Sequence, residues 1–464
     1  MSNLPTAYDN LERFTDDLCD FIATPLIRQL TGGIHVNDAL IHDSWETLPQ
    51  EWTRWWSLIA DHRLAQQDLI NAIDENAETR SKGHGEQAQF SQRRPESLTE
   101  WLSTMKSLAI SRTQRPGPTI TLPEVLMARM KTKKIAEVSR AAAYIQGVCQ
   151  SKGITHIIDM GSGQGYLSIS LAYLFPNLQI LAIDSSKSQV AGSQLFATSL
   201  DIPESRIKHL VHLIDSSLGL SAIINDWADG QSCMLVGLHA CGSLSEHMLR
   251  YFTTVNCIKA LAVVGCCYNH IVPHSPSCPT GFPISSALRE KGVKLSATAL
   301  MTACQAPNNW GTQDKDRSRG KEESDFGTRR LYRAIMEKLL FDKGIKMNFR
   351  QKPFWGIRKG DLVDFTTFAR RAMDCLEIDY DKITTVELSY YERKYQDCKG
   401  QIAILWTLSV LCCKVIESVI ALDRYLYLVE QKADNVDIVS IFDFKISPRN
   451  LMVVAEKGVV DKSQ

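Results

Sequence analysis

The chain has 464 residues, which exceeds the size that one hydrophobic core normally serves, so its length predicts one main domain with a large extension or insert. Hydrophobic residues make up 44% of the chain and charged residues 22%, which excludes a disordered or fibrous protein and predicts a sizeable core. Lys plus Arg and Asp plus Glu number 52 each, which argues against indiscriminate nucleic-acid binding but not against a local basic patch.

The N-terminal segment and the cysteines indicate in which cellular compartment the protein is expected. Residues 1–31 carry acidic side chains and lack a basic start followed by an apolar stretch, so they do not form a secretory signal. Thirteen cysteines, several within apolar segments, are typical of a reducing compartment without disulfides. The most apolar run, Ile402–Cys413, falls short of the roughly 20 residues that cross a bilayer. We expect a buried helix there, no membrane partner, and a location in the cytoplasm or nucleus.

The N-terminal region, 1–120, is predicted to be helical. Apolar residues recur there every three to four positions, which places them on one helix face. The tryptophans at 52, 55 and 56 follow the same spacing and are interpreted as core residues rather than as a ligand cage. The polar, glycine-containing stretch Glu78–Glu96 indicates a linker or surface loop. The apolar face near the N-terminus consists of Leu11, Phe14, Leu18, Phe21 and Ile22.

A basic cluster lies on a helix predicted just before the first strand. One interpretation is that a lysine of this cluster reaches a cofactor carboxylate or the phosphate of a nucleic-acid substrate. The other is a solvated basic face. The cluster consists of Arg129, Lys131, Lys133, Lys134 and Arg140.

Residues 121–305 alternate short apolar runs with helical segments, which predicts a parallel sheet covered by helices. The runs expected to form strands are Ile157–Ile158, Gln179–Ile183, Ile207–Ile214, Cys233–Leu238 and Ala260–Val264.

A glycine-rich loop follows the first of these strands, with the sequence Asp-Met-Gly-Ser-Gly-Gln-Gly over 159–165. Glycines let the backbone turn tightly and approach a ligand closely. A dinucleotide site prefers Gly-x-Gly-x-x-Gly, whereas alternating glycines after an acidic residue are the form typical of S-adenosylmethionine binding. A helix is expected from Tyr166 to Phe175. The predicted cofactor-binding residues here are Asp159, Gly161, Gly163, Gly165 and Tyr166.

Asp184 ends the second predicted strand, 19 residues after Gly165. At about this interval, an acidic side chain is placed to accept hydrogen bonds from ribose hydroxyls. We therefore predict Asp184 as a further cofactor contact. The alternatives are that the glycines serve packing alone and that Asp184 merely caps the next helix.

Beyond the core, residues 306–435 are predicted to form a charged mobile loop, at Gly311–Asp325, and a helical insert. Within 436–464, two apolar runs at Ile438–Phe444 and Leu451–Ala455 flank a turn and predict two strands that complete the sheet. The expected fold class is α/β: a class I Rossmann-like methyltransferase sheet with a helical N-terminal extension and a helical insert before its last two strands.

Two polar clusters follow the fourth and fifth predicted strands, where an open parallel sheet binds its ligands. His239 titrates near neutrality and is the candidate base, while Tyr268 and Asn269 are candidates for orienting a methyl acceptor. These three are the predicted catalytic residues. The alternative for His239 is a core histidine bonded to backbone.

The same region offers thiols and imidazoles, the ligands that zinc prefers. Adjacent cysteines seldom bind one ion, and the region has no Cys-x-x-Cys unit, so no metal is predicted. The possible ligands are Cys241, Cys266, Cys267, His270, His274 and Cys278.

Five segments carry a family resemblance: Lys133–Val138, Asp159–Leu167, Gly237–Ser245, Gly265–Tyr268 and Ser447–Leu451. Together they resemble the methyltransferase-like protein 25 family, whose members are also called ribosomal RNA adenine dimethylase domain-containing proteins. The resemblance runs from the N-terminal tryptophans to the last strand and implies the same S-adenosylmethionine contacts, from Asp159 to Asp184. An Asn-Pro-Pro-Tyr type segment that would hold an adenine amine is absent from the sequence, so that acceptor is not predicted.

The leading hypothesis is an S-adenosylmethionine-dependent methyltransferase acting on a macromolecule, either RNA or protein. RNA stays open because the segments at 238–242 and 266–268 are also similar to a transfer RNA 2'-O-methylating family. The alternatives are a small-molecule methyltransferase and a catalytically inactive binding or scaffold protein of the same fold. The oligomeric state is not predicted.

Overall fold

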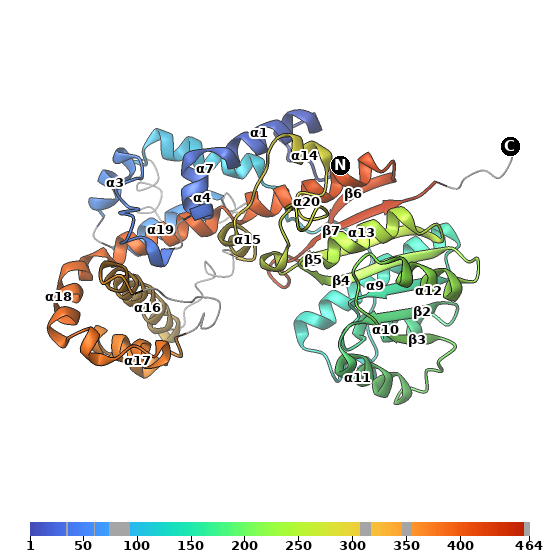
Figure 1. Ribbon diagram of the computed structural model, residues 1–464. Helices are drawn as coiled ribbons and strands as arrows, with labels where there is room; N and C mark the ends of the chain where they lie inside the picture. Colours follow the sequence, from blue (N-terminus) through green and yellow to red (C-terminus); the bar gives the residue numbers. More distant parts are fainter. Residues whose placement is uncertain (34–35, 60, 74–92, 307–316, 346–354, 459–464) are drawn as a thin grey trace. The chain divides into compact units, whose positions relative to one another are not determined.

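The computed structural model describes residues 1–33, 36–59, 61–73, 93–306, 317–345 and 355–458. The chain forms two compact units (Figure 1). The first unit comprises Met1–Phe21, Leu108–Cys304 and Lys414–Gln464, and the second comprises Ile22–Ser107 and Gln305–Cys413. Each unit therefore combines segments that lie far apart in the sequence. The domain boundaries expected from the sequence stay a prediction.

The first unit is built around a seven-stranded sheet in the order β3-β2-β1-β4-β5-β7-β6. The strands β1 to β5 are parallel, and β7 runs antiparallel between β5 and β6. The predicted α/β fold class, including the two late strands that complete the sheet, is confirmed. The strands are β1 His156–Met160, β2 Gln179–Asp184, β3 Ile207–Val211, β4 Cys233–Cys241, β5 Ile258–Cys266, β6 Asp434–Ser440 and β7 Leu451–Glu456.

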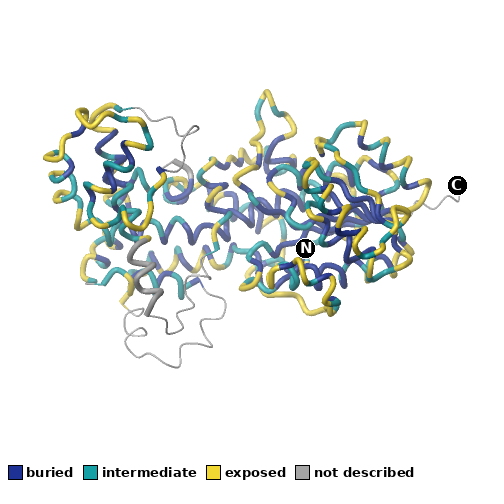
Figure 2. Tube along the Cα trace, turned by 90° about the horizontal axis from the view of Figure 1, so that it is seen from below, coloured by how far each residue is buried: buried dark blue, intermediate teal, exposed yellow. Residues whose placement is uncertain are grey.

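Helices cover both faces of this sheet, so its strands are apolar on both sides. Successive strand residues alternate between two cores: Ile157 packs in the first and Ile158 in the second. The first core includes side chains of α9 Thr132–Lys152, α10 Tyr166–Leu174 and α11 Lys187–Thr198. The second includes side chains of α12 Leu218–Ala228 and α13 Leu244–Thr254. Figure 2 shows the central strands of the sheet as buried.

The remaining elements of the first unit come from the segments that precede α9 or follow β5 in the sequence. In α20, the buried carboxylate of Asp423 accepts hydrogen bonds from the backbone N–H groups of Ile284 and Ser285. This contact holds the segment after β5 against a helix that begins far later in the chain. These elements are α1 Leu11–Ala23, α8 Glu124–Met127, η4 Tyr268–His270, α14 Ser286–Glu290, α15 Ala297–Ala303 and α20 Cys413–Glu430.

The second unit is helical, with its own apolar core around Phe365 and Phe368. Trp52 and Trp56 are buried and pack edge to face, which confirms their interpretation as core residues. The elements are α2 Pro25–Arg28, η1 Gln29–Gly33, η2 Val36–Asp38, α3 Gln50–Ser57, α4 His62–Ile73, α7 Glu96–Leu108, α16 Arg317–Asp342, η6 Lys359–Leu362, α17 Phe365–Leu376, η7 Tyr380–Lys382, α18 Thr385–Tyr395, η8 Gln396–Cys398 and α19 Lys399–Leu411.

Two loops predicted from the sequence fall partly outside the described residues. Of the predicted linker at 78–96, residues 78–92 are not described, and α7 begins at Glu96. Of the charged stretch at 311–325, residues 311–316 are not described, and α16 begins at Arg317. The prediction of a loop is wrong for 317–325, which belong to α16.

The apolar run predicted as a buried helix forms α19. By length and composition, a stretch within Thr385–Glu430 could cross a membrane, but 94% of its most apolar window is buried within the protein. Ile402 and Leu408 are almost fully inaccessible, which confirms the prediction of a buried helix.

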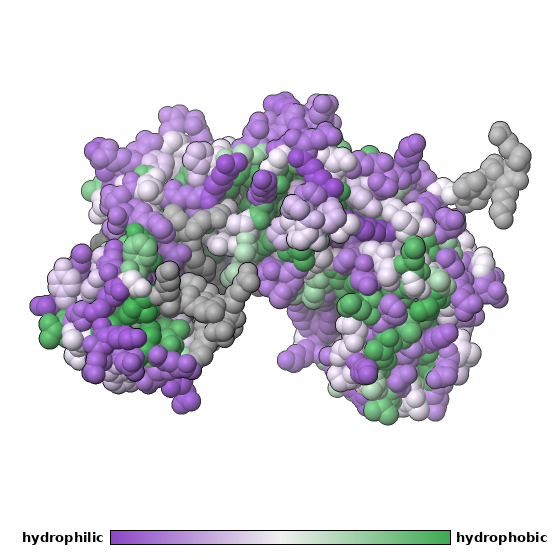
Figure 3. All heavy atoms as spheres, in the orientation of Figure 1, coloured by the Kyte–Doolittle hydropathy of each residue, from purple (hydrophilic) through white to green (hydrophobic). Residues whose placement is uncertain are grey.

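The face of the first unit seen in Figure 3 mixes polar and apolar residues.

Candidate active site

The glycine-rich loop joins β1 to α10 in a backbone conformation that favours glycine. Gly161, Gly163 and Gly165 have φ values of 74°, 54° and 71°, which side-chain-bearing residues rarely adopt. The N–H groups of Gly161 and Ser162 both donate to the carbonyl of Ile183, at 2.9 and 3.1 Å. The loop is therefore attached to the end of β2.

The glycines of the loop differ in what surrounds them. A Cβ atom at Gly165 would lie 1.9 Å from the Oγ atom of Ser193, so this glycine allows α10 and α11 to pack closely. A Cβ atom at Gly163 would meet nothing within 4 Å. The packing alternative thus accounts for Gly165, whereas the space beside Gly163 is open to a ligand.

Asp184 lies at the end of β2 and contacts the loop directly. Its Oδ2 atom accepts a hydrogen bond from the Gly163 N–H at 2.9 Å, and its Oδ1 atom accepts one from the Ser186 N–H at 2.8 Å. The N-cap of α11 is Ser186, whose hydroxyl accepts from Gln189, so capping does not explain Asp184. A carboxylate keeps further lone pairs for ligand hydroxyls when it accepts these two bonds.

Asp159 and Tyr166 flank the loop and make internal contacts. Asp159 is buried and accepts a hydrogen bond from the Ser168 hydroxyl. Its burial raises the pKa of the carboxyl to about 6. The hydroxyl of Tyr166 donates to the backbone carbonyl of Arg129 at 2.9 Å. Cofactor contacts by these two residues stay a prediction, as do those by the glycines and Asp184.

His239 lies near the end of β4 in a strained backbone conformation. Its φ is 64°, and the pairing of β4 with β5 is irregular between Leu238 and Ala240. A bulky residue in this region is uncommon, and such strain is often found at functional sites. The side chain is 25% exposed, and its Nε2 atom lies 2.9 Å from the Oε2 atom of Glu137. The imidazole is therefore paired with a carboxylate rather than bonded to backbone through this nitrogen.

Glu137, on α9, is a site residue that the sequence reasoning did not single out. Its carboxylate also contacts the Nζ atom of Lys134 at 2.7 Å and accepts a hydrogen bond from the Ser447 hydroxyl at 2.7 Å. Burial raises its pKa, but the hydrogen bonds and positive charges of His239 and Lys134 outweigh burial and hold the pKa at about 2. The one signal in the sequence was the Lys133–Val138 segment of the family resemblance.

The side chains of the basic cluster before β1 bind different groups of the protein. Lys133 and Lys134 both form ion pairs with Glu137. Arg140 is buried, and its guanidinium donates to the backbone carbonyls of Pro118 and Ile441. The alternative of a solvated basic face is therefore wrong for Arg140.

The predicted acceptor-orienting residues lie after β5. Tyr268 is 2% exposed, and its hydroxyl donates to the Oε1 atom of Glu417 at 2.6 Å. The other oxygen of Glu417 forms ion pairs with Arg112 and Arg449, at 2.7 and 2.9 Å. Asn269 is exposed, and its Oδ1 atom accepts from the Cys304 thiol at 3.4 Å. Catalytic roles for His239, Tyr268 and Asn269 stay a prediction.

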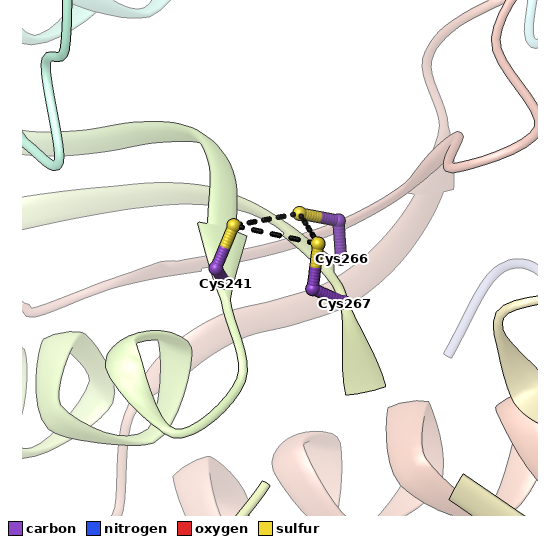
Figure 4. A group of neighbouring side chains, drawn as sticks. All are labelled: Cys241, Cys266 and Cys267. Atoms are coloured by element: carbon purple, nitrogen blue, oxygen red, sulfur yellow. Dashed lines mark hydrogen bonds between the residues drawn. The ribbon is translucent and has the colours of Figure 1, made fainter. Parts of the chain in front are cut away.

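Three of the candidate zinc ligands come together at the ends of β4 and β5 (Figure 4). The sulfur of Cys241 lies 3.3 Å from that of Cys266 and 3.6 Å from that of Cys267, and the latter two sulfurs are 3.5 Å apart. The hydrogen bond from Cys266 lowers the pKa of the Cys241 thiol to about 6. His270, His274 and Cys278 are not part of this group.

Residues 133–274 match the family of methyltransferase domains. Over 272 residues, the chain is 30% identical to the Mus musculus protein named probable methyltransferase-like protein 25, covering 54% of this chain and 41% of that one. The Homo sapiens protein of the same name is 29% identical over 269 residues, 53% of this chain and 40% of that one. A glutathione S-transferase C-terminal domain-containing protein of Xenopus laevis is 25% identical over 186 residues, 37% of this chain and 27% of that one.

Solved structures with similarity to the chain include a coclaurine N-methyltransferase bound to N-methylheliamine and SAH, with 11% identity, a TM-score of 0.26, and coverage of 91% of this chain and 98% of that one. The structure of YJHP from E. coli is similar with 14% identity and a TM-score of 0.23, and the match covers 59% of this chain and 94% of that one. The α/β fold of the first unit is established by the strand order of its sheet, not by these low TM-scores. The chain spans about two fifths of the length of the methyltransferase-like proteins it matches. The predicted resemblance is confirmed over about half of the chain rather than nearly all of it: residues 133–274 match a methyltransferase domain, and the chain is similar to proteins named probable methyltransferase-like protein 25.

Proposed function

We propose that the chain is a methyltransferase that uses S-adenosylmethionine, with the cofactor bound beside the glycine-rich loop and Asp184. The observation that carries the proposal is the hydrogen bond from the Gly163 N–H to the Asp184 carboxylate, next to open space at Gly163. This arrangement joins the ends of β1 and β2, the edge at which open α/β sheets bind ligands. The methyltransferase domain match covers both residues.

When bound, the cofactor supplies a methyl group on a positively charged sulfur. The residues of the chain have separate tasks in this proposal. Gly163 lets the backbone approach the ligand without a side chain in the way. The Asp184 carboxylate uses some of its lone pairs to accept from the N–H groups of Gly163 and Ser186. Its remaining lone pairs accept hydrogen bonds from ribose hydroxyls. The chain's contribution to rate is then the alignment of donor and acceptor, because in-line transfer depends on geometry.

His239 is the proposed base that takes a proton from the methyl acceptor. Glu137 orients its imidazole through the 2.9 Å contact and stabilises the imidazolium that forms when the proton arrives. Lys134 and Ser447 keep the Glu137 carboxylate in place. Glu137 is thus a positioning residue, and it acts through His239. Tyr268 and Asn269 are proposed to orient the acceptor from the end of β5.

The proposed acceptor is a macromolecule, either RNA or protein, met in the cytoplasm or nucleus. Support comes from the second, helical unit, which the binding of a small cofactor does not require. A small-molecule acceptor is the second candidate, because the names of the related proteins specify no acceptor.

Calorimetry with S-adenosylmethionine tests the cofactor site. Gly163→Ala and Gly153→Ala form a matched pair, since both glycines have positive φ and would place a Cβ atom in open space. Gly153 ends α9, so only the Gly163 variant should lose affinity. Asp184→Asn should weaken binding by about ten- to a hundredfold, the value of a hydrogen bond to a charged group. The exposed Asp201→Asn is its control. Undetectable binding by the unaltered protein contradicts the proposal.

Labelled cofactor identifies the acceptor. The protein is incubated with extract from cells that lack it, and the labelled products are then treated with nuclease or protease. Label that nuclease releases indicates RNA, and label that protease releases indicates protein. Label confined to small molecules rules out a macromolecular acceptor, and a chain that binds cofactor but transfers no label is a binding protein of this fold.

A further inference from the structure

The three clustered thiols come from neighbouring strand ends. Cys241 is the last residue of β4 and is paired in register with Cys266, the last residue of β5. Cys267 is the next residue of the chain. Figure 4 shows all three side chains turned toward one another. The arrangement thus depends on the parallel pairing of β4 with β5, because this pairing places the two strand ends at one edge of the sheet.

The backbone at Cys267 makes the third contact possible. In a continuous strand, successive side chains point to opposite faces, so Cys266 and Cys267 would not meet. Cys267 instead adopts the left-handed conformation, with φ 45° and ψ 49°. Its sulfur thereby comes within 3.5 Å of the Cys266 sulfur. A left-handed residue other than glycine costs free energy, and here it results in a group of three thiols.

The spacing of the sulfurs fits one small ion. A zinc–sulfur bond of about 2.3 Å at the tetrahedral angle separates two sulfur ligands by about 3.8 Å. The observed separations are 3.3 to 3.6 Å. Each sulfur is close to both others, as around a shared ion. A disulfide would instead join two of them and leave the third without a role.

We propose that Cys241, Cys266 and Cys267 bind one zinc ion, with a fourth coordination position open on the exposed side of Cys241. Zinc binds thiolates, so each of the three groups that is still protonated releases its proton to solvent on binding. Three protein ligands with an open fourth position are the pattern of catalytic zinc sites, in which water or a substrate atom completes the coordination. The site goes beyond the proposed function, and it replaces the sequence-based expectation that no metal is bound.

The test uses the full-length protein, purified under a phosphine reductant and loaded with zinc sulfate before gel filtration. Elemental analysis should find about one zinc ion per chain. Cys241→Ser is the main variant, because Cys241 is exposed and its replacement spares the core. Its zinc affinity, measured against a chromophoric chelator, should fall at least about tenfold with the loss of one of three ligands. Cys278→Ser removes a thiol outside the cluster and should keep the full zinc content.

Cobalt(II) loading of the unaltered protein should give sulfur-to-cobalt charge-transfer absorption, a result that does not depend on the folding of variants. In the variants, this absorption should weaken in Cys241→Ser and persist in Cys278→Ser. The proposal is overturned if the reduced, folded protein takes up no zinc, or if both variants lose zinc equally. It is also overturned by a Cys241–Cys266 disulfide, found by alkylation and mass spectrometry, together with no uptake after reduction.

Calorimetry with S-adenosylmethionine on the same samples separates the two proposals. Zinc content without cofactor binding counts against the proposed function alone. Cofactor binding without zinc counts against the metal site alone.

Discussion

The Nε2 atom of His239 lies 2.9 Å from the Oε2 atom of Glu137 and links the end of β4 to α9, which precedes the cofactor loop. Two unusual features coincide in this contact: a positive φ at His239 and a buried carboxylate at Glu137. The carboxylate lies within hydrogen-bond distance of the imidazole and fixes its position.

Replacing His239 by alanine should lower kcat by about 100- to 10,000-fold, the usual contribution of a general base. The affinity for S-adenosylmethionine should stay unchanged, because the loop and Asp184 are not altered. Initial rates with the acceptor that label transfer identifies, and calorimetry with the cofactor, measure the two effects. His42→Ala, at an exposed position of the second unit, is the control. An unchanged kcat in His239→Ala would exclude the histidine as the base.

Glu137→Gln should lower kcat, because glutamine retains an oxygen acceptor for the imidazole but lacks the negative charge that stabilises the imidazolium when the proton of the acceptor arrives. Initial rates of each protein are recorded at saturating cofactor and acceptor. In the double variant Glu137→Gln/His239→Ala, kcat should equal that of His239→Ala, because Glu137 acts through His239. A further loss of kcat in the double variant would assign Glu137 a merely structural role.

The same substitution should lower the free energy of unfolding near neutral pH by up to about 3 kcal/mol. In the folded protein, the pKa of Glu137 is lowered from 4.5 to about 2. Because the folded value lies below the unfolded one, this stabilisation is complete above about pH 4.5 and is lost as the pH falls through about 2. Urea unfolding of both proteins at several pH values measures the difference. Glu124→Gln, at an exposed position, should show no such pH-dependent gap.

Tyr268→Phe should lower the free energy of unfolding by about 1 to 3 kcal/mol, because a buried oxygen of Glu417 loses its donor. Thermal unfolding or urea unfolding measures this change. The substitution also tests the predicted catalytic role, if kcat is expressed per folded molecule. A kcat below that of the unaltered protein supports a role in orienting the acceptor. An unchanged kcat assigns the hydroxyl to packing against Glu417 alone.

Local pattern was sufficient for the sheet and the glycine-rich loop. The strands β1, β2, β4 and β5 are largely apolar runs, and each can be recognised without knowledge of its neighbours. The loop needs left-handed residues at 161, 163 and 165, and all three are glycines. Asp184 follows at the interval that the turn and α10 require. Because these features depend on backbone conformation and strand length, they are readable within some thirty residues.

Contacts between distant segments were decided by the tertiary structure. Glu137 meets His239 across 102 residues of sequence, and Tyr268 meets Glu417 across 149. The adjacent cysteines at 266 and 267 point to opposite faces in an ideal strand, so their sequence argues against a shared ion. Only the left-handed turn at Cys267 and the pairing of β5 with β4 bring them to Cys241. The sequence thus specifies where the backbone turns, whereas the partners of each buried charge and thiol depend on which strands and helices pack together.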